Sequence, residues 1–214
     1  MSDRESSLTL QRGLALLRAV ADADSGAVTI SELAERIGTS RAAIYRLLGP
    51  LVEQGLVWRD GASVRLGLGL LRLAERVLPQ LRHIAAPALR ELAESVGATA
   101  HLSVVDGVEM RAIAVVEPSW TSFHVAYRVG SHHAIGVGAA GKAVELSPDG
   151  DGWAVSTGEL EASASGVAAP VLGVPGLRAS VGVVSLEPLA AAVLGPQVVT
   201  TAAVVAAALR ATGS

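Results

Sequence analysis

Apolar residues recur at helical spacing in the amino-terminal part of the chain and predict successive helices. The first helix, over residues 8–21, has an apolar face made of Leu10, Leu14, Leu17 and Val20. The second begins at Thr29, which is followed three places on by Glu32, the spacing of a capping box. Its buried face is expected to consist of Ile30, Leu33, Ala34 and Ile37. Gly38 ends it, in the left-handed conformation that is common after a helix.

A third helix is expected to begin at Ser40, its N-cap, and to end at Gly55. Its inward face is expected to consist of Ile44, Leu47, Leu48 and Leu51. Pro50 lies inside this pattern and predicts a kink. Alternating segments at 56–59 and 63–66 then flank Asp60-Gly61-Ala62, the pattern of a β-hairpin. Two helices joined by a tight turn and followed by a hairpin predict a winged helix-turn-helix.

The next segment is expected to connect two domains. Gly67 and Gly69 mark a boundary, after which a helix is predicted over residues 70–81, interrupted by Pro79, and another over residues 87–96. The domain organisation predicted is a winged helix-turn-helix domain at 7–67, a linker helix at 68–83 and a second domain at 84–214.

From residue 99 the apolar period changes to two, the spacing of strands. Strands are expected at 99–105, 109–117, 122–129, 153–157, 166–172 and 178–186. Helices are expected at Gly138–Leu146 and at Pro196–Ala211, the latter packed on the sheet. Strands in series with helices at the ends predict an α+β fold with five or six antiparallel strands. The apolar run at 198–209 is shorter than the about 20 residues that cross a bilayer, so no membrane contact is expected.

Composition narrows the class of protein. The chain has 214 residues, of which 50% are hydrophobic and 17% are charged, enough to build a core. The absence of cysteine excludes a disulfide framework and thiolate metal sites. The amino terminus has no apolar signal region, and a cytoplasmic protein is expected. Through residue 82 basic residues outnumber acidic ones, whereas the remainder is acidic, so only the first segment is suited to face phosphate.

Two sets of residues resemble the IclR family of bacterial transcriptional regulators. The amino-terminal set comprises Ser7-Leu8, Gly13–Leu17, Leu33–Gly38, Arg46–Leu48 with Leu51, Gly55–Val57 and Arg65–Gly67. The carboxy-terminal set comprises Leu89–Ala93, Val129–Ser131, Ala139–Ala143 and Val167–Val171. The resemblance implies a winged-helix domain joined by a linker helix to a GAF-like effector-binding domain. It also implies a homodimer or tetramer on a palindromic operator, often near genes for small-molecule catabolism.

The chain departs from the family pattern in its second domain. Only eight residues, Val144–Asp151, stand where relatives usually carry a longer helical segment that covers the effector pocket. The proline and histidine of the family are replaced by Ala134 and Gly136. The polar pocket positions of the family are poorly kept at Ser156, Thr157 and Gly166. These departures speak against an ordinary small-acid effector and leave open an effector-independent regulator with a degenerate sensor domain.

The third helix is predicted to read double-stranded DNA, independently of the resemblance. Arginine pairs with guanine O6 and N7 in the major groove, and Arg41 and Tyr45, four places apart, share one helix face. Hydroxyls and amides at helix starts can hold phosphates. Arginines on the hairpin, which is the wing of the motif, can follow the DNA backbone or the minor groove. The candidate DNA-binding residues are Thr29, Ser31, Ser40, Arg41, Ala42, Tyr45, Arg46, Arg59 and Arg65. Two alternatives are a winged helix used for protein contact and an ion pair of Arg46 with Glu35 or Glu53.

The resemblance places the effector pocket above the sheet, beside Ala140-Gly141-Lys142. The candidate effector-binding residues are Ala139, Ala140, Gly141, Thr157, Gly166 and Ser185. The full glycine-rich spacing of a phosphate loop is absent, and the start of this small-residue helix is expected to lie beside a ligand, where free amides favour an anion.

No cofactor, metal site or catalytic residue is expected. His132 and His133 are adjacent, so in a strand they point to opposite faces and do not chelate one metal easily with His101 or His124. No nucleophile has a base at a recognisable spacing. The chain is therefore not expected to be an enzyme, and a small-molecule enzyme built on the second sheet is the weakest alternative.

Overall fold

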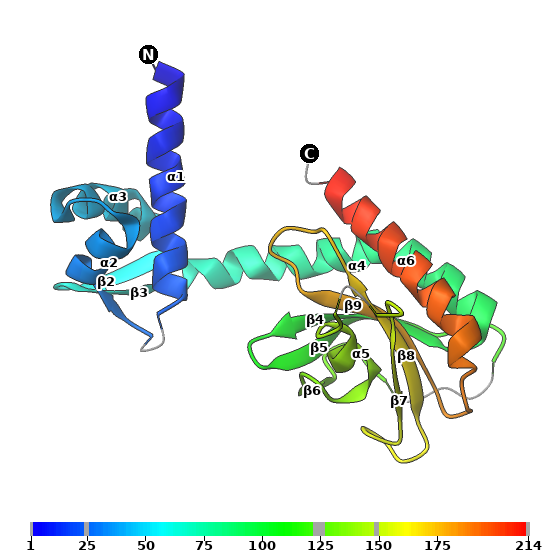
Figure 1. Cartoon of the computed structure of the whole chain (residues 1–214). Coiled ribbons are helices and arrows are strands. Elements are labelled where there is room, and N and C mark those ends of the chain that lie inside the picture. Colours follow the sequence, from blue (N-terminus) through cyan, green and yellow to red (C-terminus); the bar gives the residue numbers. More distant parts are fainter. Residues whose placement is uncertain (1, 24–25, 122–126, 148–149, 213–214) are drawn as a thin grey trace. The chain divides into compact units, whose positions relative to one another are not determined.

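The computed structural model describes residues 2–23, 26–121, 127–147 and 150–212, and the chain divides into two compact units, Met1–Val77 and Leu78–Ser214. The first unit contains the helices and short strands of the expected winged helix-turn-helix (Figure 1). Their bounds are α1 (Ser2–Ala21), β1 (Val28–Thr29), α2 (Ile30–Ile37), α3 (Arg41–Glu53), β2 (Val57–Asp60) and β3 (Ser63–Leu66). The three strands pair antiparallel in the order β1-β3-β2 among the described residues, with Asp60 opposite Ser63 at the hairpin turn.

The core of the first unit contains six of the twelve predicted inward positions, and four more, Leu17, Ile37, Leu47 and Leu51, are partly buried against it. Its buried members are Leu16, Val20, Val28, Ile30, Leu33, Ala34, Ile44, Leu48, Val57 and Val64. Leu10 and Leu14, predicted on the apolar face of α1, are instead 64% and 51% exposed. The expected kink at Pro50 does not divide the helix, since α3 continues to Glu53 as one element.

The predicted caps of α2 and α3 are confirmed. The Thr29 hydroxyl accepts a hydrogen bond from the Glu32 amide at 3.2 Å, and the Glu32 carboxylate accepts one from the Thr29 amide at 2.7 Å. The bond from the Thr29 amide, followed by one from the Thr29 hydroxyl to the same carboxylate at 2.8 Å, holds the pKa of Glu32 below its usual value. Ser40 accepts from the Ala43 amide at 3.2 Å, and Gly38 ends α2 with a φ of 66°. Local sequence therefore fixes where both helices begin.

Helix α4 (Gly69–Val96) is one continuous helix rather than the two expected. It passes through Pro79 and Pro87, although each proline removes one helical hydrogen bond. The second half buries Ala85, Leu89, Leu92 and Ala93 in the core of the second unit, and this apolar burial offsets the cost of the prolines. The boundary between the two units falls within this helix.

The second unit contains an antiparallel sheet whose described part has six strands, in the order β6-β5-β4-β9-β8-β7. The strands are β4 (Thr99–Asp106), β5 (Glu109–Val116), β6 (His132–Ala134), β7 (Ala154–Thr157), β8 (Ser165–Val171) and β9 (Ala179–Ser185). Most of the strand predicted at 122–129 lies outside the described part, which omits residues 122–126, and residues 127–129 are not in a strand. The edge next to β5 is instead formed by β6, which the sequence did not predict.

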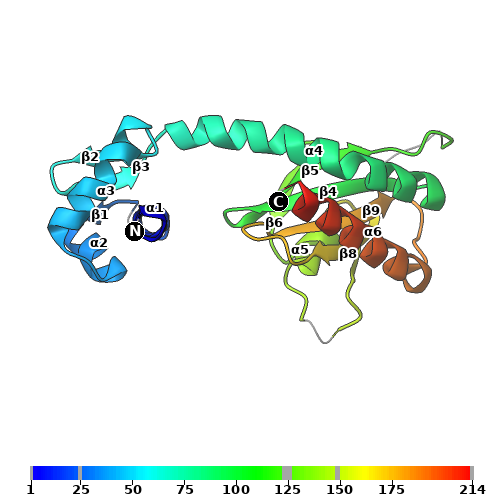
Figure 2. The ribbon, with the colours of Figure 1, turned by 90° about the horizontal axis from the view of Figure 1, so that it is seen from above.

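Helices cover both faces of this sheet (Figure 2). The second half of α4 and the helix α6 (Ala191–Ala211) pack on one face, where they enclose the main apolar core. The short helix α5 (Gly138–Ala143) lies on the other face and packs against Ala154 and Ala168. It is fastened there by Ser180, whose buried hydroxyl donates to the Ala140 carbonyl at 3.2 Å.

Helix α6 begins five residues before the expected start at Pro196. By length and composition it could cross a membrane, but one face of it belongs to the core of the second unit. The buried residues on that face are Gly195, Val198, Ala202, Val205, Ala206 and Leu209. At Gly195 a β-carbon would lie 2.3 Å from the Trp153 ring, so glycine is needed for the close approach of helix and ring. We interpret α6 as a core helix of a folded domain.

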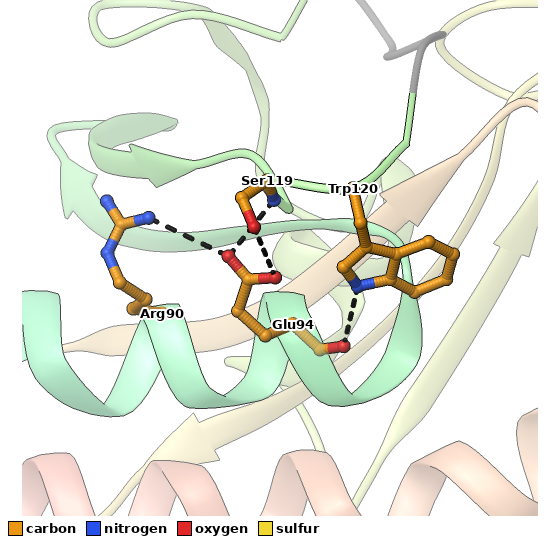
Figure 3. A network of polar contacts seen from close by, with 4 residues as sticks. All are labelled: Arg90, Glu94, Ser119 and Trp120. Carbon is orange, nitrogen blue, oxygen red and sulfur yellow. Dashed lines mark hydrogen bonds and ion pairs between the residues drawn. The ribbon is translucent and has the colours of Figure 1, made fainter.

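The loop after β5 is tied to the last turns of α4 (Figure 3). The Glu94 carboxylate accepts hydrogen bonds from the Ser119 amide and hydroxyl, both at 3.0 Å, and Arg90 lies 4.0 Å from the same carboxylate. The Trp120 indole donates to the Glu94 carbonyl at 3.0 Å. Its ring covers Gly97, where a β-carbon would come within 2.7 Å and where φ is +66°. Glycine at this position thus allows both the left-handed conformation that ends α4 and the close packing of the indole ring.

Candidate functional site

One face of α3 presents polar side chains to solvent. Burial of Ile44 and Leu48 fixes the rotation of the helix and leaves four of the predicted DNA-binding residues exposed. They are Arg41, Ala42, Tyr45 and Arg46. Tyr45 is 48% exposed, more than a structural tyrosine of a domain core would be. Among the described residues, Arg46 makes no ion pair with Glu35 or Glu53, in contrast to the structural alternative.

The hairpin of the first unit brings two further predicted arginines to the same region. The guanidinium carbon of Arg59 lies 5.3 Å from the centre of the Tyr45 ring, and that of Arg65 lies 5.8 Å from the centre of the Trp58 ring. Such contacts are cation–π interactions. The first joins the hairpin directly to α3. Trp58, which is 53% exposed on the hairpin, was not among the predicted residues.

The three predicted phosphate-contacting hydroxyls differ in their availability. Ser31 is exposed, and Ser40 uses its oxygen as the cap of α3 while keeping its hydroxyl proton to donate. Thr29 both accepts from the Glu32 amide and donates to the Glu32 carboxylate, at 2.8 Å. Its hydroxyl is therefore fully engaged, next to a negative charge.

The second unit contains a cavity of about 560 Å³ beside α5. It lies on the face of the sheet opposite α4 and α6, and its walls come from β4, β7, β8, β9, α5 and the segments around β6. The lining residues are His101, Tyr127, Ser131, His132, His133, Ala139, Ala140, Ser156, Leu160, Glu161, Ser163, Ala164, Ser165, Gly166, Val183, Val184 and Leu186.

Half of the predicted effector-binding residues line this cavity. Ala139, Ala140 and Gly166 do, whereas Gly141, Thr157 and Ser185 do not. Gly141 packs against the backbone at Gly136. A β-carbon on Gly141 would lie 3.0 Å from the amide nitrogen of Gly136.

The other two misses follow from strand geometry. Successive strand residues point to opposite faces, so Ser156 is buried toward the cavity while its neighbour Thr157 is exposed. Ser185 accepts a hydrogen bond from the Glu187 amide at 3.0 Å, at the end of β9.

A buried polar cluster at the cavity was not predicted. His101 Nδ1 lies 3.2 Å from the Ser103 hydroxyl, which lies 3.4 Å from the Tyr127 hydroxyl. The His101 and Tyr127 rings pack at 5.0 Å with an interplanar angle of 57°. His101 fits over the sheet because Gly182 stands opposite it on β9, where a β-carbon would come within 2.8 Å of Nε2. The alternation of His101 and Ser103 on one strand face was the available signal.

Burial controls the charge of this cluster. Loss of solvent lowers the pKa of His101 to about 3, with a smaller contribution from His133, so the imidazole is neutral at neutral pH. Burial also raises the pKa of Tyr127 above its usual value, so the phenol keeps its proton. The cluster of His101, Ser103 and Tyr127 is thus uncharged.

The start of α5 is occupied by a carboxylate of the chain itself. Glu159 accepts a hydrogen bond from the Gly138 amide at 3.0 Å and forms an ion pair with Lys142. The hydrogen bond from Lys142, followed by that from Gly138, holds the pKa of Glu159 below its usual value. The anion expected beside Lys142 is therefore supplied from within the protein.

Within the described residues no group of three or more His, Asp or Glu side chains could hold a metal ion. His132 and His133 both line the cavity, while His124 lies outside the described part.

A winged helix-turn-helix with an exposed polar helix face, followed by an α+β domain with a cavity, defines a two-domain class of protein. Two family models match the chain in this order: the IclR helix-turn-helix domain over residues 9–61 and the bacterial transcriptional regulator IclR C-terminal domain over residues 78–149. Together they span more than half of the chain. The protein belongs to the IclR family of transcriptional regulators.

Individual relatives agree with this assignment. The chain is 31% identical to the acetate operon repressor of Salmonella typhimurium over 144 residues, which cover 63% of this chain and 51% of the relative. It resembles a proposed transcriptional regulator of Rhodococcus sp. RHA1 with a TM-score of 0.55 and 25% identity, over 96% of this chain and 99% of that one. An IclR homologue of Microbacterium hydrocarbonoxydans, complexed with 4-hydroxybenzoate, has a TM-score of 0.53 and 20% identity, over 95% and 99% of the two chains. The matches span about half the length of the curated relatives, between 40% and 51%.

Proposed function

We propose that this protein is a cytoplasmic, sequence-specific DNA-binding transcriptional regulator, controlled by a small molecule bound in the cavity of the second unit. The observation that carries the proposal is the exposed face of α3, with Arg41, Tyr45 and Arg46 held outward by a buried opposite face. Arginines on such a face can make paired hydrogen bonds to guanine in the major groove. The family relation and the names of the relatives support the same function.

In this proposal α3 enters the major groove and the hairpin follows the phosphate backbone. Arg41 and Tyr45 lie one helical turn apart and can reach neighbouring base pairs. Arg59 and Arg65 on the hairpin can contact phosphates. The Arg59–Tyr45 contact sets the position of the hairpin relative to the reading face, the exposed side of α3. Ser31 and Ser40 are better placed than Thr29 to donate to phosphate, because the Thr29 hydroxyl is already engaged with Glu32.

A homodimer or tetramer on a palindromic operator completes the proposal. One helix reads too few base pairs, and two related by a twofold axis read two half-sites one helical turn apart. Apolar side chains exposed in the first unit support self-association: on α1 Leu8, Leu10 and Leu14, and near the start of α4 Leu68, Leu71, Leu73 and Val77. Such exposed apolar residues commonly mark contacts between chains. The mass of the protein in solution, measured by light scattering, tests this part.

The cavity supports effector control over an effector-independent regulator. A volume of about 560 Å³ is typical of small-molecule sites, and it is present although the Val144–Asp151 connection is short. A route from the cavity to α4 exists within the second unit: Arg82 of α4 donates to the Ile113 carbonyl of β5 at 2.6 Å. Strand β5 pairs in turn with β4, which carries His101, and with β6. A ligand that shifts these strands would shift α4 and with it the spacing of the half-sites.

In vitro selection of DNA bound by the purified protein tests the function. Enrichment of one inverted-repeat sequence is expected, and the same selection with mixtures of small metabolites should change the amount bound. Recovery of random sequence at low salt would refute specific recognition. Recovery of one sequence with an affinity that no mixture alters would leave a regulator without an effector.

An enzyme on the second sheet is less well supported. Among the described residues no carboxylate lies within hydrogen-bonding distance of His101, which would have to serve as the base beside Ser103. Turnover of a metabolite by protein that binds no DNA would favour this reading.

A further inference from the structure

The cavity beside α5 contains no cationic side chain of permanent charge. Its described lining residues include neither lysine nor arginine, and Glu161 is the one acidic residue among them. A carboxylate ligand moved from water into such a site would lose solvation without gaining an opposite charge. The electrostatics of the wall therefore oppose a negatively charged ligand.

Of the two cations closest along the chain to lining residues, Arg128 is exposed and does not line the cavity, and Lys142 is already neutralised. Lys142 follows Ala139 and Ala140, which line the cavity, but its ammonium group is paired with Glu159. Glu159 also accepts from the Gly138 amide at 3.0 Å. Leu160, the residue after Glu159, is a lining residue and lies against Gly138, so this internal ion pair stands immediately beside the cavity wall.

The polar groups that do face the cavity are suited to uncharged partners. His101 and Tyr127 are joined through Ser103 and are both neutral for the reasons of burial given above. His132 Nδ1 lies 3.4 Å from the Gly130 carbonyl, and His133 Nδ1 lies 3.1 Å from the Ala134 carbonyl. Because a carbonyl only accepts, Nδ1 is the donor in both rings, and in an uncharged imidazole Nε2 is then an acceptor.

The rest of the wall is apolar. Alanine, leucine and valine side chains supply it, among them Ala164, Leu186 and Val183. A ligand that fits these surroundings has an apolar body, and it carries a group that can donate a hydrogen bond to an imidazole or a hydroxyl.

We propose that the cavity binds an uncharged small molecule with an apolar body and a hydroxyl or amide group, and that it discriminates against carboxylates. This inference rests on the proposed function only in using the same cavity as the effector site. Glu159 and Glu161 set the preference: Glu159 neutralises Lys142, and Glu161 adds a negative charge to the wall.

Matched pairs of amides and acids test the proposal by titration calorimetry on the full chain. Each pair, such as 4-hydroxybenzamide and 4-hydroxybenzoate, shares size and hydroxyl and differs in charge. The titrations are run at about pH 8, at which histidine side chains in general carry no charge. We expect at least one amide to bind at least about tenfold more tightly than its acid, a difference of about 1.4 kcal/mol. A panel of aromatic and aliphatic pairs in which no amide binds more tightly than its acid overturns the proposal.

Charge variants give a second test that does not depend on one ligand. Glu161→Lys places a cation in an exposed part of the wall and is expected to raise the affinity for the acids about tenfold while leaving the amides within about threefold. Glu159→Gln frees Lys142 and is expected to act in the same direction. Glu187→Gln removes the same single negative charge as Glu159→Gln, at an exposed position outside the cavity. It should change the affinity for neither the acids nor the amides. Acid affinity unchanged in Glu161→Lys, with circular dichroism showing a folded protein, contradicts the assignment.

Operator affinity is measured separately, with and without each amide that binds. An amide that binds but leaves operator affinity unchanged counts against effector control and leaves the ligand class standing. An acid that binds as tightly as its amide and alters operator affinity counts against the ligand class and leaves effector control standing.

Discussion

The reading face of the first unit and the cavity of the second are built in opposite ways. The reading face comes from one contiguous stretch, residues 29–66, in which caps, turns and apolar spacing act over a few residues. The cavity is assembled from strands far apart in the chain, since β4 pairs with β9 and β9 with β8. The charged groups of the first unit point outward, whereas His101 at the cavity is buried and neutral.

This difference separates recognition of a charged polymer from recognition of a small molecule. DNA phosphates attract exposed arginines, which need little fixed surrounding structure because the duplex itself supplies the geometry. A small molecule has to be enclosed, and the groups that contact it have to be desolvated and held in position beforehand. The first task can be met by local sequence, and the second requires the sheet.

The largest expected effect is on the two separate cores. Leu33 and Leu102 are both 0% exposed, and truncation of either to alanine should cost about 2–5 kcal/mol in the free energy of unfolding. Because they belong to different apolar clusters, Leu33→Ala should lower protection from hydrogen exchange in the first unit and Leu102→Ala in the second. Val204→Ala, at a position that is 52% exposed, is the control. Equal loss of protection in both units from either variant would show that the two cores unfold together.

The next effect concerns the reading face. Arg41→Ala should weaken binding to the selected operator by about 1–3 kcal/mol, roughly five- to 150-fold, and relax the choice of base at one position of each half-site. Quantitative mobility shifts over single-base operator variants measure both. Arg90→Ala removes the same charge from an exposed side chain of the second unit and should leave operator affinity unchanged. A variant at Arg41 that selects the same bases as the parent protein would assign this arginine to another role.

The third effect concerns the cavity, where the buried His101 should make stability depend on pH. His101 has a folded-state pKa of about 3, below its unfolded value, so the unfolded chain binds the additional proton. The second unit should therefore lose stability as pH falls below about 6.5, by roughly 2 kcal/mol on reaching about pH 5. Urea titrations at several pH values measure this loss. In His101→Gln the loss of stability due to this residue should disappear. An unchanged dependence of stability on pH in the variant would point to another titrating group.

The smallest effect is at the cap of α2. Thr29→Ala should cost about 1 kcal/mol of stability in the first unit, while Thr29→Ser keeps the hydroxyl and most of the stability. The pKa of Glu32 is lowered in the folded state, so its contribution is present above the unfolded pKa and is lost as pH falls through the folded one. Denaturation curves for the two variants at neutral and acidic pH test both statements. Equal stability of the serine and alanine variants would remove the role of the hydroxyl.

Prediction from sequence succeeded where neighbours along the chain decide the outcome. The capping box at Thr29, the cap at Ser40, the left-handed Gly38 and the hairpin at Gly61 depend on bonds over two to four residues. Strands β4, β5, β8 and β9 were also predicted close to their bounds, although β4, β8 and β9 are buried on both faces rather than at alternate residues.

Prediction failed where distant contacts compete with a local signal. The prolines of α4 predicted an interruption that burial of Leu89 and Leu92 outweighs. Leu10 and Leu14 have the spacing of a buried face, yet they are exposed because the core of the first unit ends at Leu16.

The sequence by itself determined most of the order of elements, the exposed face of α3 and the resemblance to the family. Periodicity, caps and turn residues were sufficient for these, since each acts within one element or between neighbours. Only the tertiary structure decided which residues form the cavity. A shift of one position along β7 exchanges Thr157 for Ser156, and the place of His101 depends on Gly182, 81 positions further on in the chain and opposite it on β9. The chemistry of a buried site therefore depends on strand register and burial, which no short stretch of sequence contains.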